Sequence, residues 1–308
     1  MEKKIRVAVI GAGKLGSRHA MVYSRIPGVE LVAVCDHHDS RAREVAAACK
    51  SRGVKDYREL LGAVDAASIV VPSSAHYAVS KDFLERGVNL LIEKPITTTL
   101  ADADALLELA KAKNLLIQVG HIERFNSAIR AAKSIIKTPR FIECHRLGPY
   151  DPRVADVGVT LDLMIHDLDI VLDLVQSPVE SVDSVGAFVL SKKTEDISNA
   201  RIRFANSTVC DLTASRVTQD VMRKIRIFQD NAYISIDYVT QEAEIHTKEN
   251  GHVHRKRIDI TKSDSLKEEL TDFIECVRTG RKPIVSGWDG RQALALALEI
   301  SRQIHGTQ

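Results

Sequence analysis

A glycine-rich segment close to the start of the chain constrains the fold more than any other feature. Gly11-Ala-Gly-Lys-Leu-Gly16 directly follows the apolar run Ile5–Ile10, and a second apolar run ends in Asp36, about 20 residues after Gly16. A strand before the glycines, a helix after them and an acid at this distance are the pattern of a dinucleotide-binding βαβ unit. The alternative is a βαβ unit that binds no ligand. It is the weaker interpretation, because the strand, the helix and the acid all stand where a dinucleotide-binding unit has them.

Each residue of this pattern has a physical role. Gly11 permits a tight turn, Gly13 lets the backbone approach a pyrophosphate, and Gly16 lets the helix pack closely on the sheet. The N-terminus of that helix offers unpaired N–H groups to the phosphates. Asp36 would accept hydrogen bonds from the ribose hydroxyls.

The acid also bears on the choice of cofactor. A carboxylate beside the ribose repels a 2′-phosphate, so the sequence predicts NAD rather than NADP. His37, His38 and Arg41 stand close to Asp36 and could reduce this repulsion. The cofactor-binding residues predicted in this part of the chain are Gly11, Gly13, Lys14, Leu15, Gly16, Asp36 and Arg41.

Length and composition suit a globular protein of two domains. The chain has 308 residues, of which 44% are apolar and 27% charged, and its formal net charge is +2. This small charge gives no indication of a nucleic-acid or membrane surface. No apolar run approaches the roughly 18 residues needed to span a bilayer, and the first residues lack the build of a signal peptide. Five scattered cysteines without a Cys-x-x-Cys spacing predict reduced thiols in a cytoplasmic protein.

The pattern of elements changes near residue 120. Before it, short apolar runs alternate with helical patterns, which predicts a doubly wound parallel sheet. After it, eight alternating runs between 140 and 260 predict an antiparallel sheet, and two helices follow. The expected plan is an α/β Rossmann domain over residues 1–120 and an α+β domain with a large open antiparallel sheet over 121–308. A last helix at about 290–305 could return to the first domain.

Glu93-Lys94-Pro95 follows an apolar run, at the carboxyl end of a predicted strand. Ligands bind at this edge of open α/β sheets. Pro95 restricts the backbone of Lys94 and could carry a cis bond. A lysine held near a nicotinamide could polarise a hydroxyl or carbonyl group and stabilise oxyanion charge. The alternative is a surface Glu-Lys pair before a turn.

A stripe of ionisable residues marks the helical pattern between 159 and 175. Asp162, His166, Asp169 and Asp173 follow one another at steps of four, three and four among apolar residues. Such a stripe needs partners or a cleft, and histidine is suited to proton exchange near neutral pH. A solvated helix face is the alternative. A metal site of Asp162, His166 and Asp169 lacks a second motif with ligand spacing, so no metal is predicted.

Two further segments carry candidate ligand-binding residues. Pro72-Ser73-Ser-Ala-His76 follows another apolar strand and predicts a loop near the cofactor, although a lone histidine is more often structural. In the segment 120–126, Arg124 and Asn126 could grip an oxygen-rich substrate. The predicted cofactor-binding residues here are Pro72, Ser73, His76, Glu93 and Lys94, and the predicted substrate-binding residues are Arg124, Asn126, Arg153 and His166.

Arg146 and Arg153 stand in and beside the turn-rich segment 148–158, ahead of the helix with the ionisable stripe. Arginines clustered there suit phosphate or carboxylate recognition. Solvated loop charges are an equally good interpretation.

Taken together, these segments resemble the Gfo/Idh/MocA oxidoreductase family. The resemblance covers essentially the whole chain and implies a Rossmann domain joined to an open-faced antiparallel sheet. It implies hydride transfer between a nicotinamide and a hydroxyl or keto carbon of a sugar, inositol or nucleotide-sugar, with sheet faces paired in homodimers or homotetramers. It also implies a catalytic set of Lys94, Asp162 and His166. The resemblance rests on Gly11–Gly16 with His19, Pro72 with His76, Glu93-Lys94-Pro95, and Asp162-x-x-x-His166-Asp167-x-Asp169.

Two segments depart from the commonest pattern of that family. Many members of the family have a glycine-rich segment just before the helix with the ionisable stripe, and residues 153–162 of this chain lack it. Residues 120–126 also differ from the commonest sequence at this place in the family. Both are similar to enzymes that oxidise the 3-hydroxyl of UDP-N-acetylglucosamine for the synthesis of diamino-sugar lipid A. Dehydrogenases of another sugar, of inositol or of a non-sugar carbonyl are alternatives. A non-catalytic NAD(P)-sensing protein is a further one, against which Lys94 and His166 argue.

Overall fold

The computed structural model describes residues 4–150, 157–249 and 251–306, and the chain divides into two compact units. Unit 1 contains residues 1–122 and 266–291, and unit 2 contains residues 123–265 and 292–308. The division therefore falls close to the boundary expected at residue 120. Each unit has its own sheet and its own apolar core.

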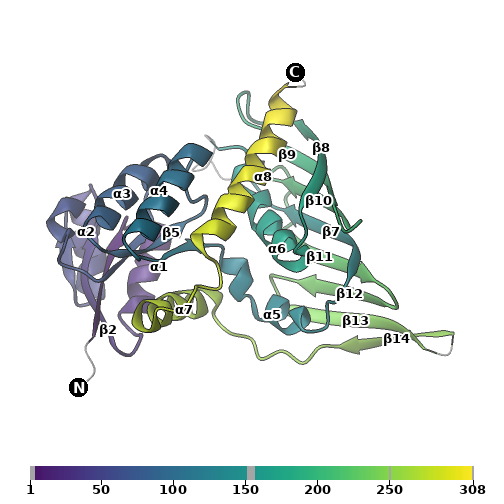
Figure 1. The fold of residues 1–308 in the computed structure, drawn as a ribbon, viewed down its shortest axis with the longest axis horizontal. Coiled ribbons are helices and arrows are strands. Elements are labelled where there is room, and N and C mark those ends of the chain that lie inside the picture. The colour runs from purple at the N-terminus through teal and green to yellow at the C-terminus, as the bar shows by residue number, and fades with distance from the viewer. Residues whose placement is uncertain (1–3, 151–156, 250, 307–308) are drawn as a thin grey trace. The chain divides into compact units, whose positions relative to one another are not determined.

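Unit 1 is built on a parallel sheet of six strands (Figure 1). The strand order is β3-β2-β1-β4-β5-β6, so the order reverses between β1 and β4. Strands buried on both faces read as nearly unbroken apolar runs, which is why the sequence pattern identified all of these strands except the short β3. Ligands of such sheets bind beyond the carboxyl ends of the strands at the point of reversal. The strands are β1 (Ile5–Ile10), β2 (Val29–Cys35), β3 (Arg52–Val54), β4 (Ala66–Ile69), β5 (Asn89–Glu93) and β6 (Ile117–Gly120).

Helices follow the strands of unit 1 in alternation, as the sequence pattern predicted. The segment after β3 forms only a short 3-10 helix. The helical segments are α1 (Lys14–Tyr23), α2 (Asp39–Ala48), η1 (Tyr57–Leu60), η2 (Ser73–Ala75), α3 (His76–Glu85), α4 (Leu100–Ala112) and α7 (Ser265–Thr279).

The second domain is not continuous, contrary to the expected span of 121–308. Helix α7 carries an apolar face, and Leu266, Leu270 and Phe273 are buried in the core of unit 1 with Val7 and Val9 of β1. Burial of this face stabilises α7 on unit 1, although the helix follows the second sheet in the sequence.

The last helix also differs from expectation. Helix α8 (Gly287–Gly306) has only its first residues in unit 1, and residues from 292 onwards belong to unit 2. Ala293, Ala297 and Ile300 lie in the core of unit 2. Most of α8 therefore stabilises the second sheet rather than returning to the first.

Unit 2 is built on a sheet of eight strands in the order β14-β13-β12-β11-β7-β10-β9-β8. Every neighbouring pair is antiparallel except β7 and β10, which are parallel. The hairpins β8–β9 and β9–β10 place β10 next to β7, and the two strands run in the same direction. The sheet therefore contains one parallel pair among antiparallel ones. The strands are β7 (Pro139–Leu147), β8 (Val179–Ala187), β9 (Ile197–Phe204), β10 (Val209–Ser215), β11 (Met222–Gln229), β12 (Ala232–Asp237), β13 (Glu242–Glu249) and β14 (His252–Arg257).

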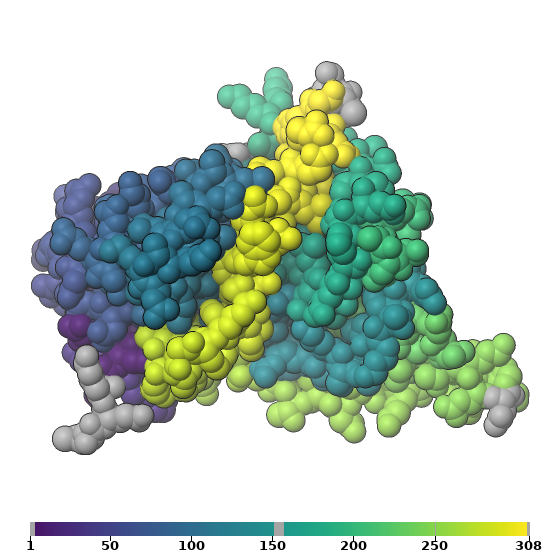
Figure 2. Space-filling view, in the orientation of Figure 1, coloured from purple at the N-terminus to yellow at the C-terminus, as the bar shows by residue number. Residues whose placement is uncertain are grey.

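The helices of unit 2 cover one face of this sheet (Figure 1). Alternation along β11 shows the two faces, because Ile225 and Ile227 are buried under the helices and Arg226 and Phe228 point to the other side. The edge strand β14 is exposed along its whole length and lies at the surface in Figure 2. The helical segments are α5 (Ser127–Lys133), η5 (Thr160–Met164), α6 (Ile165–Val175) and the later part of α8, with η3 (Ile122–Phe125) at the start.

None of the described helices has both the length and the apolar character needed to cross a membrane.

Candidate active site

The glycine loop of unit 1 has the shape that a dinucleotide requires. Gly11 has a φ of +102°, and a Cβ there would lie 2.3 Å from the carbonyl oxygen of Val70. A Cβ on Gly16 would lie 1.8 Å from the carbonyl oxygen of Gly11. A Cβ on Gly13, by contrast, would meet no described atom within 4 Å. Gly11 and Gly16 are therefore required by the fold, and Gly13 leaves open space for a close approach to the backbone.

Helix α1 begins beside this open space. Gly13 is its N-cap, and among the described residues no side chain caps the helix. The first N–H groups of a helix lack partners within the helix and favour a bound anion. Lys14 is exposed and Leu15 half-buried in the same turn. The loop and helix thus leave room for a pyrophosphate group, and its binding there stays a prediction.

Asp36 follows β2 and joins it to the glycine loop. Its Oδ2 accepts the N–H of Ala12 at 2.9 Å, and its Oδ1 accepts the N–H of His38 at 2.9 Å. A guanidinium nitrogen of Arg41 lies 3.5 Å from Oδ2. Burial alone would raise the pKa of the Asp36 carboxyl, but the two N–H groups and the guanidinium outweigh it and the pKa lies below its ordinary value. Asp36 is therefore a fixed anion at the position expected for a ribose contact.

His76 lies in the first turn of α3 and is buried. Its Nδ1 is 2.8 Å from the carbonyl oxygen of Pro95, and its Nε2 is 2.9 Å from that of Val71. Burial lowers the pKa of His76, although the carbonyl groups of Pro95 and Val71 oppose this effect. These contacts hold the loop Val71–Ala75, with Pro72 and Ser73, against the segment after β5. A contact between His76 and a cofactor stays a prediction.

Lys94 is partly buried directly after the last residue of β5. The Lys94–Pro95 peptide bond is cis, the isomer that the sequence indicated as possible. The N–H of Lys94 donates to Oε2 of Glu93 at 3.3 Å. The lysine thus lies at the carboxyl edge of the parallel sheet, as predicted.

In unit 2, Asp162 and His166 lie on either side of a change in helix type. The sequence pattern predicted one helix over 159–175. The structure has a π-helical turn over Thr160–Met164, which contains Asp162, followed by α6, which contains His166. Both side chains are half-buried. Single π turns occur often at functional sites, because the wider turn redirects the side chains within it.

The remaining acids of the stripe have cationic partners. Asp173 lies 3.0 Å from a guanidinium nitrogen of Arg124 and 2.6 Å from Nζ of Lys133. Asp169 is buried, with Oδ2 3.9 Å from Nε of Arg124. This half of the stripe is therefore an ion-paired interior face rather than a solvated one. Arg124 is buried in these pairs, and its contact with a substrate stays a prediction.

Asn126 and Arg146 also have partners within unit 2. Asn126 caps α5 by accepting the N–H of Ala128 at 3.1 Å, and its amide donates to Glu123 at 3.2 Å. Arg146 is buried, forms two hydrogen bonds of 2.8 Å with Asp167, and lies 3.1 Å from Glu123. Burial would lower the pKa of Arg146, but the two carboxylates raise it well above its ordinary value. The phosphate-binding hypothesis therefore does not hold for Arg146, and the substrate role of Asn126 stays a prediction.

Arg153, predicted to bind the substrate, lies outside the described residues. Val157 and Thr160, among the described residues that follow, are held by a buried network that the sequence pattern did not predict. Oε1 of Glu195 accepts the N–H of Thr160 at 3.1 Å, and Arg216 donates to Asp196 at 2.7 Å and to the carbonyl of Val157 at 2.6 Å. Gly158 was the only local signal, because a Cβ there would lie 2.2 Å from the Glu195 carboxylate.

Comparisons with known proteins agree with this geometry. Residues 5–121 match the family model described as "Oxidoreductase family, NAD-binding Rossmann fold", and residues 129–235 match the GFO/IDH/MocA C-terminal domain. The chain is 37% identical to a UDP-N-acetylglucosamine 3-dehydrogenase of Acidithiobacillus ferrooxidans, over 96% of each chain. A crystal structure of that dehydrogenase has a TM-score of 0.94 and 36% identity over 99% of each chain. A myo-inositol 2-dehydrogenase of Thermotoga maritima is 27% identical over 97% of this chain and 96% of the relative.

Proposed function

The chain belongs to the Gfo/Idh/MocA oxidoreductase family, and on this basis we propose that it oxidises the 3-hydroxyl of UDP-N-acetylglucosamine with NAD. The similarity to a UDP-N-acetylglucosamine 3-dehydrogenase over nearly the whole chain carries this assignment. The relatives that act on inositol are similar over the same length at lower identity. A nucleotide-sugar is therefore the first substrate to test.

Residues 5–121 form a NAD-binding Rossmann domain. The open side of Gly13, the first turn of α1 and the carboxylate of Asp36 suit a pyrophosphate and an unphosphorylated ribose. When bound, NAD supplies the acceptor for the hydride that leaves the sugar carbon. We propose NAD over NADP because the ionised Asp36 repels a 2′-phosphate.

The chain's own residues would manage the proton and the developing charge. Oxidation removes the hydroxyl proton, which passes to His166 or to Lys94. The ammonium form of Lys94 stabilises negative charge on the substrate oxygen. Asp162 orients the lysine and the histidine. Arg153, Arg124 and Asn126 remain our candidates for contacts with the diphosphate and the sugar.

The product of this reaction, a 3-keto nucleotide-sugar, is the kind of compound that an aminotransferase converts into an amino sugar. We propose this role in the synthesis of diamino-sugar lipid A, in the cytoplasm. All five cysteines are free and buried, and burial raises the pKa of Cys35 to about 12. Thiols without disulfides fit a reducing compartment.

We also propose a homodimer or homotetramer that pairs the open faces of the sheets in unit 2. This face carries a row of rings, with Phe228 5.8 Å from Phe141 and 4.9 Å from Tyr233 between ring centroids. The half-buried ion pair of Arg226 with Glu143, at 3.0 Å, lies on the same strands. Aromatic side chains surrounded by such pairs are typical of protein interfaces.

Replacement of Lys94 tests the proposed chemistry. We expect Lys94→Ala to lower kcat by about two to four orders of magnitude, the usual contribution of a group that handles protons in the reaction. Binding of NAD, measured by calorimetry, should change little. The assay incubates the protein with NAD and UDP-N-acetylglucosamine and follows reduced nicotinamide, with an aminotransferase and glutamate added to remove the keto product. Turnover that survives in Lys94→Ala would refute the assigned role.

The same assay separates the alternatives. A panel of other UDP-sugars, myo-inositol and free polyols, each with NAD or NADP, identifies the substrate class and the cofactor. Turnover of myo-inositol alone would replace the proposed substrate by the one that several relatives use. Tight NAD binding without turnover of any compound would instead indicate a sensing protein.

A further inference from the structure

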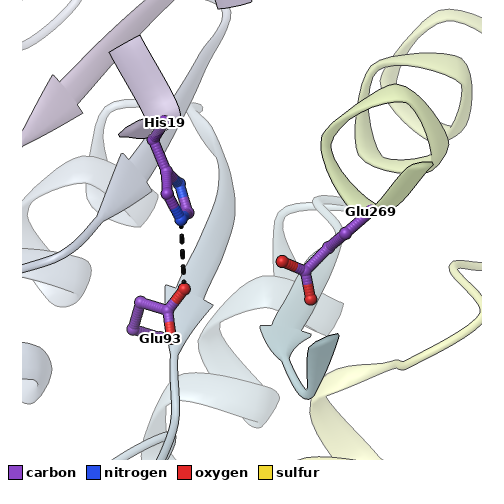
Figure 3. A group of neighbouring side chains, drawn as sticks. All are labelled: His19, Glu93 and Glu269. Carbon is purple, nitrogen blue, oxygen red and sulfur yellow. Dashed lines mark ion pairs between the residues drawn. The ribbon is translucent and has the colours of Figure 1, made fainter. Parts of the chain in front are cut away.

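Three buried ionisable side chains meet inside unit 1, behind the segment that contains Lys94. His19 comes from α1, Glu93 from the end of β5 and Glu269 from α7, and we call these three residues the anchor cluster (Figure 3). One ligand atom from each lies within 4.8 Å of those of the other two. His19 and Glu269 are fully buried, and Glu93 is 8% exposed. Burial of such groups is unfavourable unless they interact with one another, so the cluster requires an explanation.

The carboxylate of Glu93 is fixed on several sides. Its Oε1 lies 3.2 Å from Nε2 of His19, and its Oε2 accepts the N–H of Lys94 at 3.3 Å. The carboxylate also lies against Gly120 of β6, where a Cβ would approach its atoms to 2.8 Å. A larger residue at position 120 would displace it. The position of Glu93 therefore determines the position of the Lys94 backbone nitrogen.

The peptide after Lys94 is held as well. The carbonyl oxygen of Pro95 lies 2.8 Å from Nδ1 of the buried His76. Lys94 is thus fixed through Glu93 on one side and through Pro95 on the other. A lysine with its backbone fixed at both sides loses less freedom when its ammonium group is brought to a reacting oxygen.

Glu269 is presented to this cluster by a rigid element. Leu270 and Phe273 of α7 are buried in the core of unit 1, and the carbonyl of Glu269 accepts the side-chain N–H of Gln118 on β6 at 3.0 Å. Figure 3 shows the Glu269 carboxylate directed toward His19 and Glu93. An apolar side chain at this position would fill the same space without the desolvation of a carboxylate. The carboxylate of Glu269 is therefore held in place beside His19 and Glu93.

We propose that His19 and Glu269 are positioning residues for Lys94, which they act on through the carboxylate of Glu93. This inference rests on the proposed function, in which Lys94 acts on the substrate. It assigns a role in the reaction to α7, which follows the second sheet in the sequence and contains none of the residues predicted for the site.

A double-mutant cycle between Glu269 and Lys94 tests the proposal. We expect Glu269→Gln to lower kcat about threefold to tenfold and Glu269→Ala about tenfold to a hundredfold, the range that misplacement of a reacting group produces. The KM and the dissociation constant for NAD should stay within about twofold, because the glycine loop and Asp36 are untouched. On a Lys94→Ala background, measured in single turnover, neither Glu269 substitution should lower the rate further. Independent, multiplying losses would overturn the proposal.

Glu275→Gln is the matched control, because Glu275 lies on α7 outside the cluster and pairs with Arg278. Its kcat and NAD binding should equal those of the wild type. If Glu269→Ala does not fold, the double-mutant cycle of Glu269→Gln with Lys94→Ala tests the proposal by itself. Unchanged kcat in Glu269→Gln, together with an inactive Lys94→Ala, would overturn the positioning role and leave the proposed function intact. Active Lys94→Ala would instead overturn the proposed function.

The donor set of the cluster, one imidazole and two carboxylates, is also one that zinc accepts. Metal analysis of the purified protein by mass spectrometry therefore belongs to the test. We expect no stoichiometric metal. One divalent ion per chain, lost in Glu269→Gln, would overturn the proposal and make the cluster a metal site.

Discussion

The carboxylate of Asp36 interacts with the fold and, in our proposal, with the cofactor. Its two oxygens accept N–H groups of Ala12 and His38, which ties the glycine loop to the end of β2. These bonds also favour the ionised form, so the carboxylate that we propose for the ribose contact carries its charge at neutral pH. Asp36 therefore stabilises the glycine loop and, in our proposal, also favours NAD over NADP.

We expect Asp36→Asn to weaken the preference for NAD. The amide keeps one acceptor atom and carries no charge, so hydrogen bonding to the ribose weakens and repulsion of a 2′-phosphate disappears. The KM for NAD should rise about tenfold, the value of one hydrogen bond to a charged group, and the KM for NADP should fall. Steady-state kinetics with both cofactors measure the change.

Asp39→Asn is the control for this substitution. Asp39 lies three residues further on and forms an exposed ion pair with Arg43 at 2.9 Å. Exposed pairs contribute little, so both KM values should remain as in the wild type. An unchanged ratio of the two KM values in Asp36→Asn would contradict the assigned role of Asp36.

At the scale of single residues, local chemistry was predictable and long-range pairing was not. The role of Gly16 follows from backbone sterics within the loop, because its Cβ would meet the carbonyl oxygen of Gly11, five residues earlier. Arg146 looked like a phosphate ligand, but it pairs with Asp167, which lies on another element. No local pattern indicates which arginine will find a buried carboxylate.

At the scale of elements, the glycine loop offers a contrast between a structural and a binding role. We expect Gly16→Ala to lower the free energy of unfolding by about 1–3 kcal/mol or more, because its Cβ would lie 1.8 Å from the carbonyl oxygen of Gly11. Gly13→Ala should leave that free energy nearly unchanged, since its Cβ meets no described atom within 4 Å. It should nevertheless weaken NAD binding about tenfold or more, because the methyl group occupies the side from which the pyrophosphate approaches.

Chemical denaturation and calorimetric titration with NAD separate the two effects. Gly62→Asn serves as a control for glycine replacement in general, because Gly62 has a φ of +81° and open space around it, and asparagine tolerates this conformation. Normal NAD affinity in Gly13→Ala would show that the backbone does not approach the ligand there.

Elements whose pattern is set by burial were predictable within a few residues. The run Ile5–Ile10 is β1 as expected, and the first of the two helices expected after the second sheet is α7 over Ser265–Thr279. The π turn at Thr160–Met164 was not predictable, because its apolar spacing also fits a regular helix. It depends on Glu195, which accepts the N–H of Thr160 from a loop of another part of the chain.

At the scale of the whole molecule, the open sheet face of unit 2 governs assembly in our proposal. We expect Phe228→Asp to reduce the oligomer to a smaller species, because a carboxylate desolvated in an apolar contact is strongly unfavourable. Phe228 is 37% exposed in the isolated chain, so the substitution should leave the fold of a single chain intact. Light scattering after size-exclusion chromatography gives the mass.

Val189→Asp is the comparison, because Val189 is exposed but lies outside the strands. It should not alter the mass. Equal masses for wild type and Phe228→Asp would count against pairing through this face.

The division of the chain into units was only partly predictable. The change of pattern near residue 120 locates the first boundary, because parallel and antiparallel strands have different apolar patterns. The return of α7 to unit 1 could not be found in this way, since an apolar helix face does not specify which of two cores it enters. Leu270 and Phe273 pack against strand residues in the core of unit 1. Such a fit depends on the folded positions of both partners, so the sequence of α7 alone does not reveal it.

The wide turn ahead of α6 has a consequence for how such chains can diverge. A π turn accommodates one residue more than a regular helix of the same length. Loss of a single codon between 160 and 164 would restore a regular helix and change the direction of the side chains within the turn, while the segments on either side keep their positions. Asp162 would then leave the face that it now occupies, with α6 unchanged. A gap of one position in this turn, in an alignment of distant relatives, would therefore mark a change of chemistry rather than a neutral deletion.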